Sequence, residues 1–117
     1  MNSLPSQILN VSGYFMDTVL NSIKTILREN FKGEILKFIL IGSRTSSTQK
    51  DNSDYDIIIV TRNVVDSYDF VKNATRFISK ISFENKSNIE IYPVKEKNLN
   101  NTSSQFINNV ILNGIEF

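Results

Sequence analysis

Two short apolar runs dominate the middle of this 117-residue chain and limit the folds that are open to it. Residues 35–41 and residues 55–60 have the length of strands, and the second run is rich in β-branched residues. Runs that are apolar at successive positions, rather than at alternate ones, are typical of strands covered on both faces of a sheet. The chain is therefore expected to build its core around two buried strands.

Helical spacing of apolar residues predicts helices on either side of these strands. The first helix extends from about residue 8 to residue 27. The second covers residues 70–81, with Asp66 or Ser67 as its N-cap, and a polar turn at residues 84–88 is expected to follow it.

A third strand and a last helix complete the pattern. Residues 89–94 form an apolar run with one charged residue inside it, which predicts a strand, and Pro93 predicts that this strand ends there or lies at an edge of the sheet. Residues 106–111 predict a helix that stops at Asn113 and Gly114, in the manner of a left-handed glycine cap.

This order of elements predicts one α/β (α+β) domain over residues 1–117. A small mixed sheet of about three to four strands would pack with about three to four helices. The polar residues 45–53 permit antiparallel pairing of the first two strands. The helix before the third strand suits a parallel crossover.

Composition removes several classes of chemistry. The chain has no cysteine and no histidine, which excludes disulfides, thiolate zinc sites and Ser-His-Asp catalysis. A formal net charge of +1 provides no overall basic field, so direct nucleic-acid binding is not expected. The N-terminus does not resemble a leader and no apolar run approaches bilayer length, so a cytoplasmic protein without membrane contact is expected.

A pair of carboxylates opens the second strand. Asp54 and Asp56 lie two residues apart, so in a strand their side chains project from the same face. Like charges at the start of an apolar strand repel each other, and a divalent cation with oxygen ligands, Mg²⁺ or Mn²⁺, would relieve that repulsion. The alternative is that both acids simply face solvent.

Glu90 is the third candidate acid, because it is the charged residue in an Ile-Glu-Ile sequence. If the third strand lies beside the second, Glu90 reaches the same site as Asp54 and Asp56. Three carboxylates around one or two Mg²⁺ ions are typical of phosphoryl or nucleotidyl transfer. A solvent-facing glutamate is the alternative.

The first apolar run ends at Gly42, Ser43 and Arg44. Glycine permits close backbone approach to a ligand, and free N–H groups after Ser43, with its hydroxyl, would suit a phosphate. An ordinary turn is the alternative.

Taken together, these residues resemble the signature of the DNA polymerase beta-like nucleotidyltransferases. In that signature a strand ending in Gly-Ser is followed, after a loop of about this length, by Asp-hydrophobic-Asp-hydrophobic; here ten residues separate Ser43 from Asp54. The resemblance implies that Gly42 and Ser43, with Arg44 beside them, hold the phosphates of a nucleotide. It also implies that Asp54 and Asp56 bind two metal ions, while Glu90 supports the catalytic metal and the acceptor hydroxyl.

The size and order of elements resemble the minimal nucleotidyltransferases. Members of that branch are antitoxins of HEPN-domain toxins, and the resemblance implies Mg²⁺-dependent transfer of AMP from ATP to a toxin tyrosine. Residues 45–50 contain no glycine, unlike this loop in minimal members, and the third acid is more often Asp than Glu. Two alternatives stay open: a non-catalytic antitoxin that binds its partner by contact, and an antibiotic-type nucleotidyltransferase that forms its acceptor pocket as a homo-oligomer.

Overall fold

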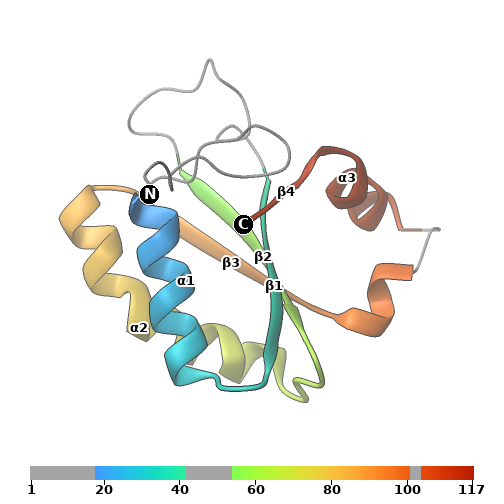
Figure 1. The fold of residues 1–117 in the computed structure, drawn as a ribbon, viewed down its shortest axis with the longest axis horizontal. Coiled ribbons are helices and arrows are strands. Elements are labelled where there is room, and N and C mark those ends of the chain that lie inside the picture. The colour runs from blue at the N-terminus through green and yellow to red at the C-terminus, as the bar shows by residue number, and fades with distance from the viewer. Residues whose placement is uncertain (1–17, 42–53, 101–103) are drawn as a thin grey trace, which may run out of the picture.

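The computed structural model describes residues 18–41, 54–100 and 104–117. Three α-helices, one 3₁₀ helix (η2) and four strands occupy these ranges (Figure 1). In chain order they are α1 Thr18–Asn30, β1 Ile35–Ile41, β2 Tyr55–Thr61, α2 Ser67–Asn85, β3 Ile89–Lys95, η2 Glu96–Asn100, α3 Gln105–Asn113 and β4 Ile115–Glu116. Residues 8–17, which the sequence assigns to the first helix, lie outside the described ranges.

The four strands form one mixed sheet in the order β3-β2-β1-β4. Strand β1 pairs antiparallel with β2 and with β4, whereas β2 and β3 are parallel and are joined through α2. The predicted fold class and both predicted strand pairings are confirmed. Strand β3 lies at an edge of the sheet, as Pro93 predicted.

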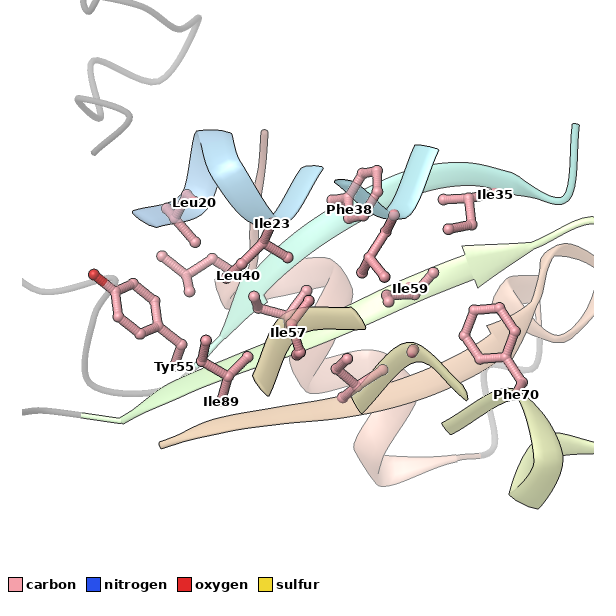
Figure 2. Packing of buried hydrophobic residues seen from close by; sticks show 14 of the residues in the cluster. Leu20, Ile23, Ile35, Phe38, Leu40, Tyr55, Ile57, Ile59, Phe70 and Ile89 are labelled. Carbon is pink, nitrogen blue, oxygen red and sulfur yellow. The ribbon is translucent and has the colours of Figure 1, made fainter. Parts of the chain in front are cut away.

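Helices cover both faces of the sheet, which explains why β2 is apolar at successive positions. Figure 1 shows α1 and α2 together on one side and α3 on the other. Ile57 and Ile59 belong to the core on the side of α1 and α2, together with Leu20, Phe38 and Leu40 (Figure 2). Ile58 and Val60 point the opposite way and pack with Val110 of α3.

The second helix begins where the sequence predicted and ends later. The Asp66 side chain caps α2 by accepting a hydrogen bond of 3.0 Å from the backbone N–H of Asp69. Residues 84 and 85, predicted to lie in a turn, continue the helix. The turn follows at Lys86, which adopts the left-handed conformation at φ 51° and whose N–H bonds to the carbonyl oxygens of the last turn.

The predicted left-handed cap at Gly114 is wrong. Gly114 is extended, with φ −77° and ψ 154°, and it leads directly into β4. The reason for glycine here is space, because a Cβ would lie 2.5 Å from Ile39 Cγ2 and 2.7 Å from the carbonyl oxygen of Val110. Glycine thus lets β4 turn closely off α3 onto β1.

None of the helices in the described ranges is both long enough and apolar enough to span a bilayer.

Candidate active site

The start of β2 presents the two aspartates on the face of the sheet that carries α3. Asp54 immediately precedes the strand and is exposed, and Asp56 is its second residue and half-buried. Tyr55, between them, is buried in the core on the opposite face. Because side chains alternate along a strand, Asp54 and Asp56 share the face of Ile58, as the sequence predicted.

Glu90 is the direct neighbour of Asp56 on the adjacent strand. In the parallel pairing of β2 with β3, Asp56 is opposite Glu90, flanked by Tyr55 opposite Ile89 and Ile57 opposite Ile91. These four flanking residues are all buried on the side of α1 and α2, and a shift by one residue would bring Glu90 into that core. The apolar residues therefore fix the register that brings the third acid alongside the first two.

The three carboxylates influence one another electrostatically. Partial burial raises the pKa of Asp56 above its ordinary value of 3.8, and the negative charges of Asp54 and Glu90 raise it further. A hydrogen bond from Tyr92 opposes these effects and lowers the pKa. The site as a whole favours a neutral Asp56 more than water does.

Two further polar residues of β3 and its entry contact this group, and the sequence reasoning missed both. Tyr92 donates a hydrogen bond of 3.4 Å from Oη to Oδ1 of Asp56, and Asn88 donates one of 2.8 Å from Nδ2 to Oε2 of Glu90. Burial raises the pKa of Tyr92, and so do the nearby charges of Asp56 and Glu90 and the hydrogen bond to Asp56. The sequence pattern could have identified both, because residues 88, 90 and 92 alternate with buried isoleucines and therefore share one face of the strand.

The donor chemistry of these residues suits Mg²⁺, since the site offers hard carboxylate oxygens with like charges close together. The side chains do not form a ready ligand cage, because no three acidic groups in the described ranges stand close enough together to hold a metal ion. Asp56 and Glu90 instead engage Tyr92 and Asn88. The predicted metal ligands thus lie at one end of the sheet, and metal binding by them stays a prediction.

The predicted phosphate-binding residues Gly42, Ser43 and Arg44 lie outside the described ranges. The last described residue before them is Ile41, which pairs with Asp56 across β1 and β2.

Several solved structures share this fold. A chain of a toxin–antitoxin complex with AMP-PNP is 22% identical, with a TM-score of 0.57 over 82% of this chain and 69% of that chain. A putative nucleotidyltransferase from Sulfolobus solfataricus is 18% identical, with a TM-score of 0.59 over 85% of this chain and 76% of that one. A chain of the tri-AMPylated Shewanella oneidensis HEPN toxin in complex with MNT antitoxin is 17% identical, with a TM-score of 0.52 over 82% and 66%.

A search of curated proteins found no match. The profile of the family described as Polymerase beta, Nucleotidyltransferase matches residues 21–117, which include every described strand and the three candidate acids. The chain therefore belongs to the polymerase beta nucleotidyltransferase family.

Proposed function

We propose that this protein transfers AMP from ATP to a hydroxyl group, and that the acceptor is a tyrosine of a HEPN-type toxin for which it is the cytoplasmic antitoxin. The observation that carries the proposal is the pairing of Glu90 with Asp56 in register, with Asp54 two residues earlier, in a chain of this family. Two structures that share the fold support the choice of nucleotide and acceptor: one contains AMP-PNP and the other an AMPylated HEPN toxin.

In the proposed reaction, the acceptor hydroxyl loses its proton to solvent and its oxygen forms a bond to the α-phosphorus of ATP, while the bond from that phosphorus to pyrophosphate breaks. Asp54 and Asp56 are the proposed metal ligands from β2, and Glu90 is the proposed ligand from β3 that also orients the acceptor hydroxyl. When bound, Mg²⁺ supplies the positive charge that polarises the phosphate oxygens. Gly42, Ser43 and Arg44 are the proposed contacts to the phosphates of ATP.

The charges around Asp56 bear on how the site binds its ligands. Asp56 is half-buried and is flanked by the negative charges of Asp54 and Glu90, so its ionised form gains from a balancing positive charge. A divalent cation bound with ATP would provide that balance. The site is therefore expected to bind nucleotide and metal together more tightly than either alone.

The test is transfer of label from ATP labelled at the α-phosphate to a HEPN toxin in the presence of Mg²⁺. Asp56→Asn and Glu90→Gln are each expected to lower the rate by more than about 100-fold, because each removes a proposed metal ligand. Glu29→Gln, which removes an exposed charge on α1, is the matched control and is expected to retain the full rate. Full activity in Asp56→Asn and Glu90→Gln would exclude the proposed catalytic role.

A non-catalytic antitoxin is the second candidate, and one observation favours it: the described side chains form no three-acid metal group. Calorimetry with ATP and Mg²⁺ separates the two functions. A catalytic site requires metal-dependent nucleotide binding, whereas a contact antitoxin blocks the toxin without it.

A further inference from the structure

A polar hollow lies at the opposite end of the sheet from the three carboxylates. It measures about 490 Å³ and is bordered by the start of β1, the residues that follow β2 and the junction of β3 with η2. Asp56 and Arg62 are six residues apart along β2, which corresponds to about 20 Å at the rise of a strand. The hollow is therefore separate from the candidate active site.

Positive charge predominates around this hollow. Of the residues that the structure describes, four cationic side chains and one carboxylate border it: Lys37, Arg62, Lys95 and Lys97 against Glu96. The net charge of +1 for the whole chain does not exclude such a local cluster of positive charge.

Two of the four cations already have partners, and two do not. Arg62 Nε donates a hydrogen bond of 3.1 Å to the carbonyl oxygen of Gly33, which holds its guanidinium in place. Lys37 Nζ lies 4.0 Å from a carboxylate oxygen of Glu116, at the limit of an ion pair. Lys95 and Lys97 form no ion pair within the described ranges, and both also border an adjoining hollow of about 430 Å³.

We propose that this hollow binds closely spaced phosphate groups, either those of an RNA backbone or those of a small polyphosphate. Lysine and arginine are the side chains that bind phosphate oxygens, and here they surround a concave space that a chain of phosphates can enter. Among the described residues, neither hollow is lined by an aromatic side chain on which a base would stack. Recognition is therefore of phosphates and not of base sequence.

The experiment measures binding to the full chain by fluorescence anisotropy with a labelled single-stranded RNA, and by calorimetry with inorganic tripolyphosphate. Lys95→Gln/Lys97→Gln is expected to weaken binding about 10-fold and to reduce the slope of log K against log[salt] by about 1.4, because two phosphate contacts to a single strand are lost. Lys72→Gln/Lys80→Gln removes the same charge from exposed positions on α2 and is expected to bind as the wild type does. Lys97→Gln alone, at an exposed position, is expected to show part of the loss.

The two ligands distinguish the source of the phosphates. RNA binding that tripolyphosphate displaces supports a nucleic-acid backbone, and tripolyphosphate binding without RNA binding supports a small polyphosphate. The proposal is overturned if neither ligand binds the wild type at physiological salt, or if the two double variants weaken binding equally. The measurements are made in a chelator without Mg²⁺, because the proposed ATP site requires metal and tripolyphosphate would otherwise occupy it. Binding that Lys95→Gln/Lys97→Gln weakens under these conditions is assigned to the hollow, so the result is independent of the proposed function.

Discussion

Tyr92 donates a hydrogen bond to Asp56 from the neighbouring strand, at 3.4 Å from Oη to Oδ1. Ordinary O–H···O hydrogen bonds measure about 2.5–3.0 Å, so this one is weak. It nevertheless favours the ionised form of Asp56 and lowers its pKa against the effects of burial and of the two other acids. Tyr92→Phe is therefore expected to raise the pKa of Asp56 further.

An NMR titration of the Asp56 carboxyl carbon, without divalent cations, measures this change. Tyr68→Phe is the matched control, because Tyr68 is 79% exposed on α2 and does not share the site. A pKa of Asp56 that falls in Tyr92→Phe, or that moves equally in both variants, would contradict the interpretation.

Asp56→Asn is expected to stabilise the metal-free protein at neutral pH. The pKa of Asp56 is raised in the folded state, so the folded protein binds more protons than the unfolded chain between pH 3.8 and the folded pKa. Stability therefore falls as pH rises through that window, and the full penalty is present above the folded pKa. Asparagine carries no charge and avoids the penalty.

Thermal unfolding in a chelator, at pH 7 and near pH 3.8, checks the direction of this change in stability with pH. The variant should melt above the wild type at pH 7, and the difference should shrink at the acid end. A difference that grows on acidification would show that Asp56 has a lowered pKa instead.

Mg²⁺ or Mn²⁺ is expected to raise the melting temperature of the wild type, because a ligand that binds only the folded state stabilises it. Stabilisation of about 2.7 kcal/mol corresponds to a metal concentration of 100 times Kd. Asp56→Asn should lose most of this shift, whereas Glu29→Gln should keep it. An equal shift in Asp56→Asn, or with KCl at the same ionic strength, would indicate that the metal binds elsewhere.

Gly114→Ala is expected to destabilise the fold by about 1–3 kcal/mol, because the added methyl group overlaps the Val110 carbonyl oxygen and Ile39. The methyl group should also displace β4 from β1. The amide of Phe117 donates a 2.9 Å hydrogen bond to the Phe38 carbonyl oxygen beyond β4.

Urea unfolding gives the stability, and hydrogen exchange at the Phe117 amide reports on β4. Gly33→Ala provides the comparison, since Gly33 has a left-handed φ of 77° but open space around it, and strain of about 1–2 kcal/mol is expected. Faster exchange at Phe117 in Gly114→Ala alone would confirm the steric account. Equal exchange rates in the two variants would contradict it.

The sequence was sufficient to predict strands β1, β2 and β3 and the placement of Glu90 beside Asp56. Residues 57–60 of β2 are all buried because helices cover both faces, and that same burial makes the run apolar and recognisable. Parallel pairing followed from the helix between β2 and β3, and a third strand beside the second was expected to bring Glu90 to Asp56, as it does.

Features that depend on non-local contacts could not be predicted in this way. Strand β4 has only two residues, too few to show a periodic pattern of apolar side chains. Its partner is β1, which is far away in the sequence. The need for glycine at position 114 depends in part on Ile39 of that strand, which no pattern at the end of α3 reveals. The bond from Tyr92 to Asp56 likewise exists only once the two strands pair.

The position of β3 at the edge of the sheet has a consequence for aggregation. An unpaired edge is a template on which another molecule can add a strand and extend the sheet between chains. Proline and charged side chains on such an edge oppose that addition, and β3 carries Pro93, Glu90 and Lys95. Glu90 therefore protects the protein against intermolecular β-pairing whether or not it ever holds a metal ion.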